Sequence, residues 1–245
     1  MAYFYGQGRV YIGARDAQGN PTGLNFVGNV PELKVSLSVE TLEHQEAQSG
    51  QRLTDVHVIK AKKGEFACTL EELSAGNLAL ALFGTTTVTT PGTVTSEALP
   101  RPITPGSLYL LDRQNVSAVQ MVDAYGQIVA PQDYSVNAKH GSVVLRDLRS
   151  YGEPLTVDYA YGAAQTTAMF TQPLPERWIR FEGLNTADAN REVVIDLYRV
   201  AINPAKELSI ITDDLLKFEL SGQVLADLTK PVGGDLGQFA RMVIL

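Results

Sequence analysis

The chain has 245 residues, with 20 Lys and Arg against 27 Asp and Glu and a formal net charge of −7. This length allows one large domain or two smaller ones, and a hydrophobic content of 44% provides enough apolar surface to exclude global disorder. The acidic balance argues against tight nucleic-acid binding, which normally requires a basic face. No apolar run reaches the roughly 18 residues of a membrane-spanning helix, and the first residues do not resemble a signal peptide. We therefore expect no membrane insertion.

The single cysteine, Cys68, rules out an internal disulfide and any zinc site that needs two thiolates from one chain. It alternates with Phe66 and Leu70, which places its side chain on the apolar side of a strand. We therefore predict a buried structural thiol, not a reactive one, in a protein that folds in a reducing cytoplasm.

Alternating polar and apolar residues dominate the N-terminal part and predict strands. Segments 9–13 and 24–28 flank a turn, and residues 32–40 form the clearest strand of the chain. We expect its apolar set to pack on the core, and the set comprises Leu33, Val35, Leu37 and Val39. We expect the opposite set to face water, and this set comprises Glu32, Lys34, Ser36, Ser38 and Glu40.

Residues 41–64 break this alternation and are long, polar and rich in Gln. We predict a polar loop here, and loops of this length inside a domain are usually functional or disordered. The side chains that we expect to make contacts from it are Glu43, His44, Gln45, Glu46, Gln48, Gln51, Arg52, Lys60, Lys62 and Lys63.

One helix is predicted after a strand at 65–73. Ser74 is suited to cap its N-terminus, residues 77–83 carry the helical leucines, and Gly84 ends it. The Thr-rich segment 85–93 that follows is typical of an edge strand or a linker.

Residues 101–162 are predicted to form an inserted all-β module, separating the two parts of a core at 1–100 and 163–245. The module's expected strands cover 107–111, 118–122, 134–136, 142–145 and 155–161, and those of the later core part cover 177–183, 192–200, 216–225 and 239–245. The fold class is mainly β, with one or two short helices.

Motifs for catalysis are absent from the sequence. His44, His57 and His140 do not have the spacing of a metal site, and Gly6-Gln7-Gly8 leads into a strand instead of a helix. Adjacent acids at 71–72 and 213–214 would point to opposite faces of a strand, so we interpret them as solvated charges. We expect no cofactor and no enzyme, and a β scaffold of this kind suits binding to other proteins or to copies of itself.

The order of these segments resembles a known family. An N-terminal strand pair, the strand from Val30, the polar loop, the helix at 74–84 and the closing unit from Arg180 to Asp227 are similar to the major tail tube proteins of long-tailed, non-contractile bacteriophages. The resemblance covers most of the chain except the inserted module.

The resemblance implies a β-sandwich with a flanking helix that assembles into stacked, usually hexameric, rings. The resulting tube conducts the phage genome, and sheets of neighbouring subunits would join around its lumen. Under this hypothesis the 32–40 polar set faces the lumen, the 41–64 loop bridges subunits or rings, and the module lies outside. The expected partners are further copies, the tape measure and tail terminator proteins, and DNA that passes without specific binding. The expected location is the virion tail, after synthesis in the host cytoplasm.

Three other interpretations remain open at this point. The chain is alternatively a β-sandwich adhesin or carbohydrate-binding module, for which Trp178 and a group of tyrosines would have to form an aromatic platform. Those tyrosines are Tyr109, Tyr125, Tyr134, Tyr159 and Tyr161. The second interpretation is a tube protein of a contractile tail or secretion system. The third is an enzyme of unrecognised type.

Overall fold

The computed structural model describes residues 3–148 and 151–245, and the fold is mainly β with one α-helix, as the sequence predicts. The chain divides into two compact units, one formed by 1–85 with 167–245 and the other by 86–166. The second unit starts earlier than the predicted module, because the strand β6 (Gly92–Ala98) pairs with β11 (Thr156–Tyr161) inside it.

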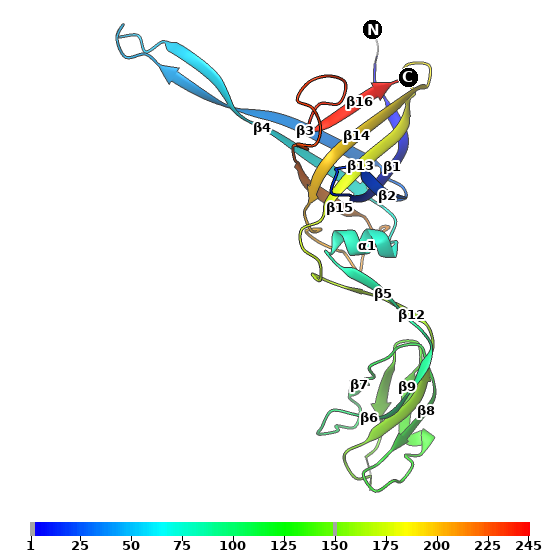
Figure 1. The fold of residues 1–245 in the computed structure, drawn as a ribbon. Helices are drawn as coiled ribbons and strands as arrows, with labels where there is room; N and C mark the ends of the chain where they lie inside the picture. The colour runs from blue at the N-terminus through cyan, green and yellow to red at the C-terminus, as the bar shows by residue number, and fades with distance from the viewer. Residues whose placement is uncertain (1–2, 149–150) are drawn as a thin grey trace. The chain divides into compact units, whose positions relative to one another are not determined.

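The first unit contains one large antiparallel sheet (Figure 1). Its strands follow the order β2-β1-β13-β14-β15-β4-β3, and β16 pairs with the other end of β14. Their bounds are β1 Gly6–Arg15, β2 Pro21–Phe26, β3 Glu32–Gln45, β4 Thr54–Leu70, β13 Glu176–Asn185, β14 Arg191–Ile202, β15 Phe218–Val224 and β16 Ala240–Ile244.

The core of this unit lies against one face of the sheet. Alternate residues of β4 and β15, among them Cys68 and Leu220, are buried together with residues of β1, β13 and β14. Cys68 is 3% exposed, which confirms its predicted structural burial, and the burial raises its pKa to about 12. A thiol with this pKa is protonated and unreactive near neutral pH.

The helix α1 (Ala75–Ala81) begins as the sequence predicts. The Ser74 side chain accepts a hydrogen bond from the Asn77 backbone nitrogen at 3.2 Å, which satisfies one of the free N–H groups of the first turn. Ala81 is buried in the core of the first unit, and Leu80 packs against that core. After the helix, β5 (Thr85–Thr89) pairs with β12 (Ala164–Ala168) in a ribbon that joins the two units.

The prediction of a polar loop at 41–64 is wrong. β3 continues to Gln45 and β4 begins at Thr54, so only 46–53 form a turn at the end of a long hairpin. Irregularities in the register, between Glu40 and Thr41 and between His44 and Gln45, shift the pairing and hide the alternation in the sequence. The candidates Glu43, His44 and Gln45 lie in β3, Lys60, Lys62 and Lys63 in β4, and Glu46, Gln48, Gln51 and Arg52 in the turn.

The expectation that the apolar side of 32–40 packs on the core is also wrong for most of its length. Leu33 packs against the core, but Val35, Leu37 and Val39 are 40%, 75% and 57% exposed. Leu37 and Val39 lie where the sheet narrows to two strands, because β15 pairs with β4 only as far as Gly64, opposite Leu37. From there on, β3 and β4 pair only with each other.

The second unit has a core of its own between two three-stranded sheets. Their strand orders are β7-β10-β9 and β6-β11-β8. The remaining bounds are β7 Leu108–Leu110, β8 Val116–Val122, β9 Tyr134–Asn137 and β10 Ser142–Leu145, with a short 3-10 turn η1 at Pro131–Asp133. Met121, Val143 and Leu155 are among its buried residues. This unit therefore buries its own apolar side chains.

Candidate functional site

The part of the hairpin beyond Gly64 and Leu37 is a two-stranded arm (Figure 1). Its turn is ordered by Glu46, whose carboxylate accepts hydrogen bonds from the Ser49 hydroxyl and from the backbone nitrogens of Gln48 and Ser49. These bonds, that from the Ser49 hydroxyl first, lower the pKa of Glu46 to about 2. The turn is therefore built from charge-assisted contacts and holds the two strand ends together.

Cross-strand ion pairs follow the arm. Glu40 lies 3.0 Å from Lys60 Nζ and 3.2 Å from Lys63 Nζ, and these bonds lower its pKa. Nearer the turn, His57 lies 3.1 Å from Glu43 and His44 lies 2.6 Å from Asp55. All these groups are exposed or partly exposed, so each pair contributes little to stability.

The predicted lumen set does lie on one face of β3, since its members alternate along the strand. However, the ammonium groups of Lys60 and Lys63 in β4 also lie on this face, because both contact Glu40. Lys34 forms an ion pair with Glu32 at 2.6 Å. Taken alone, the face of β3 carries two glutamates and one lysine, but the lysines of β4 balance this charge.

The arm exposes apolar side chains on both faces, which is unusual for a water-exposed hairpin. Leu37, Val39 and Ile59 lie on the face that continues from the core, because Thr41, on that face of β3, pairs with Ile59. Toward the turn, Leu42, Val56 and Val58 are 57%, 43% and 48% exposed on the opposite face. An isolated two-stranded hairpin is marginally stable in water, so these faces suit contact with another surface.

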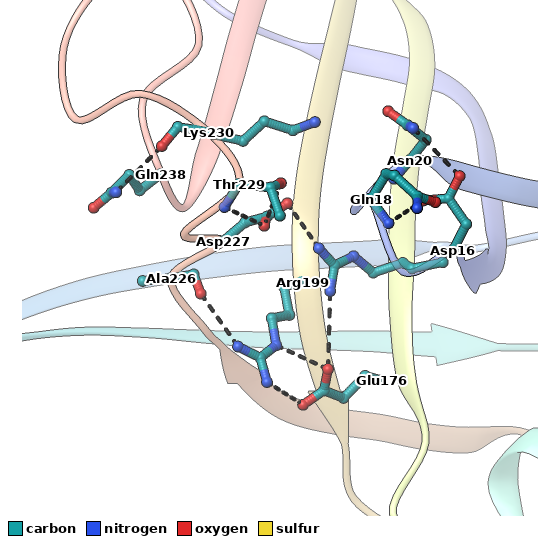
Figure 2. A network of polar contacts seen from close by, with 11 residues as sticks. Asp16, Gln18, Asn20, Glu176, Arg199, Ala226, Asp227, Thr229, Lys230 and Gln238 are labelled. Carbon is teal, nitrogen blue, oxygen red and sulfur yellow. Dashed lines mark hydrogen bonds and ion pairs between the residues drawn. The ribbon is translucent and has the colours of Figure 1, made fainter.

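A second cluster of polar residues is not predicted from the sequence. Figure 2 shows Arg199 reaching both Glu176 and the carbonyl of Ala226, beside Asp227. Arg15 Nη2 donates to Asp227 at 2.7 Å, and Asp227 also accepts from the backbone and hydroxyl of Thr229. These contacts attach the segment after β15 to the start of β13 and the end of β1.

Asp196 of β14 forms a third cluster and is fully buried. It accepts hydrogen bonds from Trp178 Nε1 at 3.2 Å, Arg180 Nη1 at 3.3 Å and Arg241 Nε at 2.9 Å. Arg241 belongs to β16, so this carboxylate fixes the last strand to the sheet. Its partners are distant in the sequence, which leaves no local pattern from which to predict it.

These clusters pair each carboxylate with cations or hydrogen-bond donors and place no nucleophile beside a base. Within 3–148 and 151–245, no group of three or more His, Cys, Asp or Glu side chains is arranged to hold a metal ion. His140 lies 3.0 Å from Asn137 and far along the chain from His44 and His57. The chemistry that the arrangement supports is structural attachment and surface contact.

Most of the aromatic side chains that the sequence analysis assigned to a sugar-binding platform are not exposed in the described residues. Trp178 is 6% exposed and packs on Tyr198 with ring centroids 5.0 Å apart, and Tyr134 and Tyr159 are also buried. Tyr125 is 84% exposed, but a sugar-binding surface of the predicted kind needs several such rings. The burial of Trp178, Tyr134 and Tyr159 thus removes the main support for the carbohydrate-binding alternative.

The sequence matches the model of a known family. The model of a family described as Protein of unknown function UCP028589 matches residues 3–243. The chain belongs to this family. No curated protein matches the sequence. Among the described residues, no helix has the length and apolar character needed to cross a membrane.

Proposed function

We propose that the chain is a self-assembling structural subunit, and specifically a major tail tube protein of a long-tailed phage. Copies form stacked rings, and the stack is the conduit for the genome in the virion tail. The subunit is made in the host cytoplasm, uses no cofactor and catalyses no reaction. Its partners are other copies, the tape measure and tail terminator proteins, and the DNA, which passes through the lumen without specific binding.

The observation that carries the proposal is the arm. It exposes Leu37, Leu42 and Val58 at 75%, 57% and 48%, and its strands beyond Gly64 have no partner but each other within the described chain. Such a hairpin gains stability when another surface covers it. In an assembly of several copies, the neighbouring copy can provide that surface.

The open edge of β3 supports the same proposal. β3 is 14 residues long and ends the sheet order, so its outer backbone groups face solvent in the described monomer. Long open edges promote association, and a head-to-tail contact between copies closes into a ring when the rotation allows it. The resemblance of the element order to tail tube proteins supports the specific identity.

Negative-stain microscopy of concentrated protein tests the proposal. We expect rings or tubes, whereas monodisperse monomers at every concentration would contradict it. A trimmed variant then tests the arm: residues 41–60 are replaced by Asn-Gly, which joins Glu40 to Ala61, its partner in the register. No deleted side chain belongs to the core, so the variant should keep the thermal unfolding midpoint of the wild type and lose assembly. Normal tubes from the trimmed protein would remove the arm from the mechanism.

A tube protein of a contractile tail or secretion system is the alternative that shares these observations. A contractile system surrounds its tube with a sheath. Co-purification of a sheath protein with the assembled tubes would therefore favour this alternative over the long-tailed phage.

A further inference from the structure

Two exposed patches of this chain are complementary to each other. The first, the root patch, consists of Leu37, Val39, Ile59 and Lys62 on the core-side face of the arm. The second, the acidic loop, covers residues 208–216 between β14 and β15. Each combines apolar side chains with charge of one sign, and the signs are opposite.

The root patch is apolar around one lysine. Leu37, Val39 and Ile59 are 75%, 57% and 56% exposed, and Lys62 stands directly opposite Val39 in the register. Lys60 and Lys63 bind Glu40, but Lys62 has no ion-pair partner among the residues that the structure describes. Its charge is therefore available to a carboxylate from outside the monomer.

The acidic loop has the reverse character. Ile210, Ile211 and Leu215 are 85%, 96% and 84% exposed, and Asp213 and Asp214 are the loop's only charged residues. Neither aspartate makes an ion pair within 3–148 or 151–245, although the Asp214 backbone nitrogen bonds the Thr212 hydroxyl. Exposed isoleucines beside unpaired acids are characteristic of a contact surface rather than of a solvated loop.

The sheet places these patches at opposite ends of the same two strands. Phe218, where β15 begins after the loop, pairs with Leu70, whereas Val224 pairs with Gly64 at the root of the arm. The Lys217 contact with Glu71, at 3.1 Å, fixes the loop at its own end. The intervening six residues of strand span roughly 20 Å, and the exposure of both patches shows that they do not meet within one copy.

We propose that the acidic loop of one copy docks on the root patch of the next copy. The apolar side chains pack together, and Asp213 and Asp214 face Lys62 across the contact. Because the two patches are different and lie at opposite ends, the contact is head-to-tail and repeats from copy to copy. This inference rests on the proposed self-assembly and names the surfaces that carry it.

A charge-exchange experiment tests the proposal in the full-length chain. Lys62→Glu alone should raise the concentration needed for assembly about fivefold, the size expected for an exposed ion pair replaced by repulsion. Asp213→Lys with Asp214→Lys should do the same or more. All three substitutions together restore opposite charges with reversed signs, and assembly should return toward the wild-type concentration. Sedimentation velocity measures the assembly, and thermal unfolding verifies that each exposed substitution leaves the monomer folded.

The apolar part of the contact has its own variant. Ile210→Ser with Ile211→Ser removes two exposed side chains without changing the charge, and should raise the assembly concentration roughly tenfold or more. Asp235→Lys, an exposed charge reversal in another loop, is the matched control and should assemble like wild type.

The outcomes separate this inference from the proposed function. If wild-type protein assembles and all the variants assemble equally well, the docking is wrong while the tube function stands. Failure of the triple variant to recover also overturns the pairing. If the variants form normal assemblies that no longer bind another protein of the particle, then that protein contacts these patches. Docking between copies is then wrong. Wild-type protein that never assembles removes both proposals.

Discussion

At the scale of single residues, we expect the buried carboxylate of Asp196 to be sensitive to substitution. It is fully buried and bonds two arginines and the Trp178 indole. Asp196→Asn keeps the shape but leaves these donors without an anion, so we expect a loss of about 2–4 kcal/mol in the free energy of unfolding. Urea unfolding measures this. Asp235→Asn, at an exposed position, is the control with an expected change near zero.

The carboxylates that hold the segment after β15 predict a pH dependence. Bonds from Arg199 lower the pKa of Glu176; burial opposes the ionisation of Asp227, but bonds from Thr229 and Arg15 outweigh it and lower that pKa too. A depressed pKa stabilises the folded state above the ordinary values of 3.8 and 4.5, and this stability is lost as the pH falls through the folded values. Unfolding free energy should therefore drop below about pH 4.5, and less steeply in Glu176→Gln. Equal slopes for the two proteins would contradict this assignment.

At the scale of elements, the sequence predicts what regular alternation and caps can show. Residues 32–40, the Ser74 cap and the buried side of Cys68 follow from local pattern, because neighbouring residues carry the signal. The arm does not follow from local pattern. The irregular register near Glu40 leaves one extra residue in β4 and so reverses the face that the apolar residues of β4 occupy. The clusters of Asp196 and Asp227 do not follow from local pattern either, because partners such as Arg241 and Arg15 lie far away in the sequence. For the acidic loop, the sequence indicates only solvated acids at 213–214, and the exposure of Ile210 and Ile211 in the structure is what indicates a contact surface.

The ion pairs at the base of the arm give a prediction at the same scale. Glu40→Lys would place three lysines together, because Glu40 contacts both Lys60 and Lys63. We expect faster amide hydrogen exchange along 41–59 with unchanged exchange in the core strands. Glu65→Lys is the matched control, since Glu65 faces Ser36 on the same side of the hairpin and makes no ion pair among the described residues. Equal exchange in both variants would show that these pairs do not hold the arm.

At the scale of the whole molecule, two separate cores imply two separable units. The first unit buries its side chains around β4 and β14, and the second around Met121 and Leu155, in clusters that share no residue. The chain enters and leaves the second unit at adjacent points, since the hydroxyls of Thr85 and Thr171 lie 2.8 Å apart. Replacing 86–166 with a short Gly/Ser bridge should therefore leave the first unit folded, because few residues are needed to close the gap. Both the arm and the acidic loop belong to the first unit, so the shortened protein should also assemble in negative-stain images. A folded but non-assembling product would mean that the second unit supplies contacts between copies, and would place it within the ring instead of on its outside.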